Sequence, residues 1–326
     1  MSEATVDRIP LPTALAERFR RDWDTAIVPL VFVVMVLTFW ALDPNYLSRT
    51  NVINVLNQVS ILAVVTVGAS IVIFTGGFDL SAGAIVALSG VIGALVVEQT
   101  GSVAMAVAAG IGVGLLVGIV NGMFVGYLGV SPLIVTLGAL NVCRGLALLL
   151  SGGSPIYSFP SSFTAFGTSR FLDLPVLAWI AFALFALVAL VLRFTPLGLY
   201  IFAVGGNPRA AKISGLNVPA IRMLAFAISG ACCGLAGMLL TSRTGGGEPA
   251  AGFAYELEAI AAVILGGAAL AGGEGRLWRS LMGILMLACL GNGLNIVGIH
   301  PHWKGVAIGA ILVIAASLDA VKRRGQ

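Results

Sequence analysis

Long apolar runs separated by short polar breaks extend from residue 26 almost to the end of the chain. A helix needs about 17 to 25 such residues to cross a hydrocarbon layer roughly 30 Å thick. The pattern predicts an all-α polytopic membrane protein with about ten spanning helices. We place them at residues 26–42, 53–75, 82–97, 103–128, 133–150, 175–192, 223–241, 258–272, 279–297 and 303–318. The run at 82–97 is short, and Gly76–Ser81 could break a helix inside the bilayer instead of ending it.

Composition excludes a soluble domain, because 59% of the 326 residues are hydrophobic and 10% are charged. An average soluble domain has about a quarter charged residues. The net charge of +4 comes without a basic face, so nucleic acid is not predicted as a partner. The four cysteines lie inside apolar segments without the spacing of a metal site, and we interpret them as small buried hydrophobic residues. They are Cys143, Cys232, Cys233 and Cys289.

The 18 lysines and arginines predict the topology, since basic residues concentrate in cytoplasmic loops. With ten helices and an inside N-terminus, the inside residues are Arg8, Arg18, Arg20, Arg21, Arg193, Arg209, Lys212, Arg222, Arg276, Arg279, Lys322, Arg323 and Arg324. The outside residues are Arg49, Arg170, Arg243 and Lys304, and Arg144 lies within a span. Both termini are therefore predicted to be cytoplasmic. Segments 1–25 and 319–326 would flank a transmembrane domain at 26–318.

Glycine forms two patterns. A stripe at four-residue spacing gives one smooth ridge, which lets another helix backbone approach closely in lipid. It consists of Gly110, Gly114, Gly118, Gly122 and Gly126. Separately, "GGFDLSAG" at Gly76–Gly83 is echoed by "GGAALAGG" at Gly266–Gly273. Each copy joins two apolar segments, which suggests an internal duplication, and such paired glycine breaks point to a transport site near the repeat interface.

The longest charged segment between spans, 193–222, contains "AVGGNPRAAKISGLNVP". Asn207 can cap a short helix, Pro208 fits its first position, and Gly215 can adopt the left-handed conformation that ends it. About two turns of helix are too short to be stable alone in water, so this helix needs a partner or the membrane surface. No lysine follows a glycine, so the chain cannot bind ATP through a Walker-type loop.

Four stretches together resemble the permease subunit of ribose-type ABC importers, a bacterial sugar-uptake family. They are "GGFDLSAG", "GVSPLIVTLGALNVCRGLALLLSGGSPI", "GGNPRAAKISGLNV" and "ELEAIAAVILGGAALAGGEG". The resemblance covers about Asn51 to Arg324 and is not specific for one sugar. Phe78, Ala271 and Glu258 stand where the family tends to have a small aliphatic residue, a serine and an aspartate.

The resemblance implies a multi-pass protein of the bacterial inner membrane that is not an enzyme and binds no cofactor or metal. It implies three partners: a second permease subunit, which is either a second copy in a homodimer or a paralogue, a cytoplasmic ABC ATPase that holds ATP and Mg, and a periplasmic sugar-binding protein. The ligand would be ribose or a related pentose, hexose or polyol. The outer loop at 151–175 suits docking of the binding protein, although an ordinary ordered loop explains it equally well.

The same resemblance matches the 193–222 segment to a cytoplasmic coupling loop that sits in a groove of the ATPase. The predicted coupling residues are Gly205, Gly206, Asn207, Pro208, Arg209, Ala210, Ala211, Lys212, Ser214 and Gly215. Arg209 and Lys212 would orient the helix against acidic groups, while Ala210, Ala211 and Ile213 fill the groove. In the alternative, the two cations only anchor the topology.

Polar groups inside spans usually face protein or a water-filled cavity. Amides both donate and accept hydrogen bonds, which suits sugar hydroxyls. The candidate residues of a translocation path are Asn57, Asp79, Asn121, Asn141, Arg144, Asn292 and Asn295. In the alternative, these groups only bond helices to one another. Arg144 would cost about 2.5 to 3.5 kcal/mol at mid-span and so needs a partner, water or a position near the outer end.

Asp79 has three interpretations. It or Ser81 caps the helix that begins near Ala82, it lines the path and accepts sugar hydroxyls, or it relays protons. The last would suit an ion-coupled secondary transporter, the main alternative function, but Asp79 is the only acid clearly embedded in the membrane, which weakens that alternative. An enzyme is disfavoured because no paired-carboxylate or nucleophile-base constellation occurs, and His300 and His302 share one short outer turn.

Overall fold

The computed structural model describes residues 28–157, 159–300 and 302–324, so the predicted cytoplasmic segment at 1–25 lies outside it. Within these ranges, seven helices are long and apolar enough to cross a membrane. They are α2 (Arg49–Phe74), α3 (Ala82–Thr100), α4 (Val103–Gly126), α5 (Pro132–Ser151), α7 (Val176–Phe194), α10 (Val218–Thr244) and α12 (Leu277–Ile296). The predicted class of all-α polytopic membrane protein is confirmed, and the predicted count of ten spans is not.

The remaining elements are shorter or only partly apolar. They are the first described helix (Val28–Leu42), η1 (Pro44–Leu47), α6 (Ser161–Thr168), α8 (Pro196–Gly206), α9 (Pro208–Ile213), α11 (Tyr255–Leu265) and α13 (Trp303–Arg324, apolar over Trp303–Ile314). Strands β1 (Arg170–Phe171) and β2 (Leu174–Pro175) form an antiparallel hairpin. The predicted outer loop at 151–175 therefore contains a helix and a hairpin, which the sequence did not indicate.

The prediction of a complete span at 258–272 is wrong. The 11 residues of α11 rise only about 16 Å at 1.5 Å per residue, roughly half of a hydrocarbon layer. The helix ends at Leu265 because Gly266 and Gly267 follow, and Gly267 has a left-handed φ of +79°. The segment instead dips into the bundle and continues as a glycine loop up to α12.

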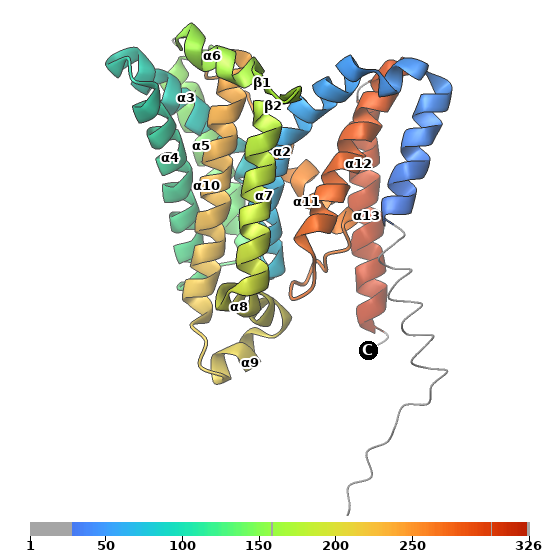
Figure 1. The fold of residues 1–326 in the computed structure, drawn as a ribbon. Coiled ribbons are helices and arrows are strands. Elements are labelled where there is room, and N and C mark those ends of the chain that lie inside the picture. The colour runs from blue at the N-terminus through green and yellow to red at the C-terminus, as the bar shows by residue number, and fades with distance from the viewer. Residues whose placement is uncertain (1–27, 158, 301, 325–326) are drawn as a thin grey trace, which may run out of the picture.

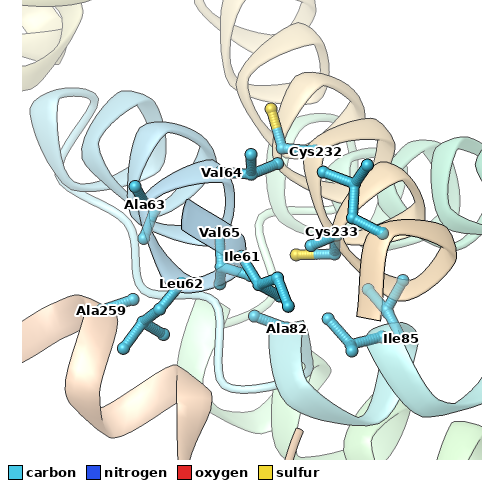
Figure 2. Close-up of a cluster of buried hydrophobic side chains, with 14 of the residues drawn as sticks. Ile61, Leu62, Ala63, Val64, Val65, Ala82, Ile85, Cys232, Cys233 and Ala259 are labelled. Carbon is cyan, nitrogen blue, oxygen red and sulfur yellow. The ribbon is translucent and has the colours of Figure 1, made fainter. Parts of the chain in front are cut away.

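Helix α2 forms the centre of the bundle and is buried almost continuously from Val59 to Phe74. Its residues Ile61 to Val65 lie between Cys232 and Cys233 of α10 on one side and Ala259 of α11 on the other (Figure 2). Cys143 is buried as well, and Cys289 is half-buried. The interpretation of the cysteines as small buried residues is confirmed for Cys143, Cys232 and Cys233.

The glycine stripe of α4 packs against α10, as its spacing predicted. A methyl group on Gly114, Gly118 or Gly122 would overlap backbone atoms of Gly230, Phe226 and Met223 respectively. Backbones this close exclude any side chain, so the five glycines fix the α4–α10 pair. In Figure 1 this pair forms one side of the molecule, and α12 and α13 form the other.

Candidate functional site

The short helix predicted within the 193–222 segment is confirmed as α9. The Asn207 side-chain oxygen accepts a hydrogen bond from the Ala210 amide at 3.0 Å, and Pro208 occupies the first helical position. Gly215 has the left-handed φ of +85° that a helix stop requires. Helix α9 lies at one end of the molecule, opposite α6 and the β1–β2 hairpin (Figure 1).

The surface of α9 combines two cations with one apolar side chain. Arg209, Ala210 and Lys212 are exposed, and Ile213 is 88% exposed. Ala211 is 4% exposed and belongs to a buried cluster of the chain itself. Of the three apolar residues predicted to fill a partner's groove, only Ala210 and Ile213 are therefore available to a partner. A single exposed isoleucine is ordinary on a protein surface, so it indicates a contact only in combination with the capped helix and the two neighbouring cations.

Immediately before α9, the backbone of α8 touches both predicted glycine loops. A methyl group on Gly205 would overlap the carbonyl oxygen of Phe74 and the amide nitrogen of Gly273. The Gly273 amide donates a hydrogen bond to that carbonyl at 3.0 Å. A methyl group on Gly272 would meet the Gly76 backbone about as closely. We call Gly76, Gly205, Gly272 and Gly273 the glycine junction; it connects the segment that carries α9 to both membrane loops.

Asp79 lies in the first loop, buried in a network of four polar side chains. Its Oδ1 accepts from the Ser81 amide at 3.0 Å and from the Ser81 hydroxyl at 2.6 Å. Its Oδ2 accepts from the Ser229 hydroxyl of α10 at 2.8 Å. Asn121 of α4 donates to Ser81 Oγ at 3.0 Å. The acid therefore connects the start of α3 to α10, and Ser81 connects it to α4.

Neither Ser81 nor Asp79 caps α3 in the usual way, by accepting a hydrogen bond from a backbone amide in the first turn of the helix. Ser81 holds the N-cap position, but its side chain makes no cap hydrogen bond. Asp79 instead bonds the Ser81 amide, just before the first helical residue. Asp79 is 3% exposed and Asn121 is 1% exposed. Asn121 also borders an apolar groove between α4 and α5, which offers a sugar few polar partners.

Three other predicted path residues lie apart from one another. Asn141 is exposed on α5 and donates to Leu137 of its own helix at 2.9 Å. Arg144 donates to the carbonyls of Pro249 and Ala251, both at 2.8 Å. These two carbonyls are the partner that a charge within a span requires. Asn57 is half-buried, and its carbonyl accepts a long bond of 3.4 Å from Arg243.

Asn292 and Asn295 line a polar cavity of about 250 Å³ between α2, α11, α12 and α13. The whole lining consists of Gln58, Val59, Leu62, Tyr255, Glu258, Ala288, Gly291, Asn292, Asn295 and Lys304. Lys304 Nζ lies 2.7 Å from Glu258 Oε2, and the two side chains are 27% and 13% exposed. We call this space the polar cavity. It brings together polar groups from four helices.

Sequence reasoning missed Tyr255, Glu258 and Lys304 as site residues, because each lies at a helix end where a polar residue is ordinary. The available signal was a pair of opposite charges at the ends of two predicted spans. Only the folded structure shows that these two charges pair, since α11 and α13 are far apart in the sequence. Among the described residues, no group of three histidines, cysteines or acids could hold a metal ion.

Residues 51–316 match the family described as "Branched-chain amino acid transport system / permease component". The chain is 37% identical to the ribose import permease protein RbsC of Escherichia coli (strain K12), covering 94% of this chain and 97% of that protein. It is 35% identical to the D-allose transport system permease protein AlsC of that strain, covering 92% and 93%. Identity to the galactose/methyl galactoside import permease protein MglC is 33%, covering 90% and 93%. No solved structure matches the chain.

Proposed function

Because this chain belongs to the family of ribose-type import permeases, we propose that it is the membrane subunit of an ATP-driven ABC importer for a monosaccharide. The substrate class is ribose or a related pentose, hexose or polyol, in keeping with relatives named for ribose, allose and galactose. The chain is a multi-pass permease of the bacterial inner membrane. It forms a homodimer, and ATP and Mg bind to a separate ATPase subunit.

The observation that carries this proposal is the exposed surface of α9, which follows the glycine junction in the chain. A rigid capped helix transmits displacement that a flexible loop would absorb. Ile213 and Ala210 contact the ATPase groove, while Arg209 and Lys212 pair with acidic groups at its rim. Motion of α9 reaches the end of α2 and the second glycine loop because Gly205 lies in direct backbone contact with Phe74 and Gly273.

The sugar path begins at the end opposite α9, where a periplasmic binding protein docks on α6 and the hairpin. Asn292 and Asn295 line it there. Asp79 and Asn121 lie deeper, and a path that reaches them requires the loop at Gly76–Ser81 to move. Asn57, Asn141 and Arg144 remain predicted path residues that face no cavity in common with the others.

Proteoliposomes that hold the permease, its ATPase and its binding protein test the proposal. We expect internal ATP to drive uptake of at least one of D-ribose, D-allose and D-galactose, with no uptake when the ATPase is omitted. L-leucine serves as a control solute because of the amino-acid description of the wider family. Sugar uptake by the permease alone under a pH or sodium gradient would instead establish an ion-coupled secondary transporter.

A further inference from the structure

The polar cavity is lined by two side-chain amides that make no hydrogen bond to any described residue. Asn292 already has a partner, because its amide and that of Asn51 each donate to the other, at 2.8 and 2.9 Å. By contrast, no described residue hydrogen bonds to the side-chain amides of Gln58 and Asn295, although both face the cavity. Each amide offers two donors and one acceptor oxygen. Such groups in a membrane bundle imply water or a polar solute beside them.

The charged pair at one side of the cavity carries no net charge. Lys304 and Glu258 neutralise each other, and Lys304 keeps donors that the carboxylate does not use. The lysine stem lies over Gly291, where a methyl group would come within 2.9 Å of Lys304 Cδ. Because Gly291 has no side chain, the lysine stem can pass over it and reach the cavity. A neutral site with strong donors and acceptors suits hydroxyl groups better than an ion.

Size and position narrow the ligand further. The volume of about 250 Å³ is below the roughly 300–1,000 Å³ of pockets that take drug-sized molecules, so one sugar ring suits it better than two. Tyr255 adds a ring with an apolar face and a polar hydroxyl. Lys304 stands at the start of α13, at the end of the molecule opposite α9 (Figure 1).

We propose that the polar cavity binds one neutral monosaccharide within the permease, between Gln58 and Asn295 and the Lys304–Glu258 pair. This inference rests on the proposed function, because the site receives sugar on the periplasmic side before the inner loops open. Affinity comes from hydroxyl bonds to the two amides and to the charged pair. A charged solute is disfavoured, since an anion would lie beside the Glu258 carboxylate and a cation beside the Lys304 ammonium group.

The direct test is chemical protection of a cysteine in the cavity. Asn295→Cys in the complete transporter should react with a small thiol reagent, since Asn295 is exposed to the cavity. Saturating D-ribose, D-allose or D-galactose should slow the reaction at least about threefold, whereas L-leucine should not. Gln99→Cys, an exposed site at the end of α3, controls for reagent access and should not be protected. Protection by none of the three sugars overturns the proposal.

Uptake measurements supply the second arm and separate the two claims. Gln58→Leu and Asn295→Leu break no hydrogen bond to a described residue, so both should assemble, and each should lower sugar uptake about tenfold, the effect of roughly 1.4 kcal/mol of lost bonding. Glu258→Gln should lower it at least as much, and Gln99→Leu should leave it unchanged. Wild-type protein that fails to import any sugar contradicts the proposed function. Normal uptake by all three cavity variants contradicts this inference alone.

Discussion

The two glycine loops share a sequence pattern, but different bonds hold them in place. In the first loop, Asp79 binds Ser81 and Ser229 through side chains, and α10 and the start of α3 are held together. The second loop has Ala269 at the corresponding position and makes its bonds through the backbone. The Ala269 amide donates to Glu274 at 3.2 Å, and the Gly273 amide donates to Phe74.

The difference shows that the glycine break does not require the acid. Both loops follow one helix and precede another, and they meet directly at the junction, where Gly272 lies against Gly76. The second loop depends on close backbone approach, which any added side chain would prevent. The first depends on a buried carboxylate, which a change of hydrogen-bonding groups would disturb. The internal duplication that the pattern suggests stays a prediction.

Adding a methyl group at the junction should have the largest effect. Gly205→Ala places carbon against two backbone groups that cannot move aside, and we expect a loss of about 3 kcal/mol. Gly206→Ala is the matched control, because its nearest neighbour would be 3.9 Å away. The melting temperature of the purified permease should fall by roughly 6 °C or more for the first variant and stay unchanged for the second. Equal melting temperatures would show that the junction is not tightly packed.

Removing the acid of the first loop should have an intermediate effect. Asp79→Ala leaves the buried hydroxyls of Ser81 and Ser229 without their acceptor, at a cost of about 2 kcal/mol. Asp79→Asn keeps an acceptor for Ser81 and can donate to Ser229, so it should cost less. Ala269→Ser in the second loop should be nearly neutral. If Asp79→Ala and Ala269→Ser shift the melting temperature alike, the two loops do not differ in the way described.

The smallest effect is expected from the serine that binds the acid across helices. Ser229→Ala deletes one donor to Asp79 Oδ2 and should cost about 1 kcal/mol. The Asp79→Ala change should then cost less in the Ser229→Ala background than in wild type, because the two side chains share one bond. A double-mutant cycle on melting temperatures measures this coupling. Simple additivity would contradict a direct Asp79–Ser229 bond in the folded protein.

Local signals in the sequence predicted the elements that need no distant partner. The cap at Asn207, the stop at Gly215 and the ridge of α4 glycines follow from local chemistry, and all three are present. The half-length of α11 was missed because residues 258–272 are apolar enough to span, while Gly266 ends the helix early.

The contacts between distant segments could not be predicted. Nothing local links Lys304 to Glu258, or Gly205 to Phe74, since each pair meets only through tertiary packing. Asp79 was recognised as unusual, but its partner Ser229 lies on a helix more than a hundred residues later. Arg144 was expected to need a partner, and the two backbone carbonyls that bind it come from a distant loop.

The most direct test of the central claim, that energy from an ATPase enters through α9, is charge reversal on that helix. Arg209→Glu with Lys212→Glu changes only exposed side chains, so the permease should fold with an unchanged melting temperature. ATP-driven sugar uptake and co-purification of the ATPase, measured on the same preparation, should both be lost. A folded variant that imports sugar and retains the ATPase as well as wild type would contradict the claim.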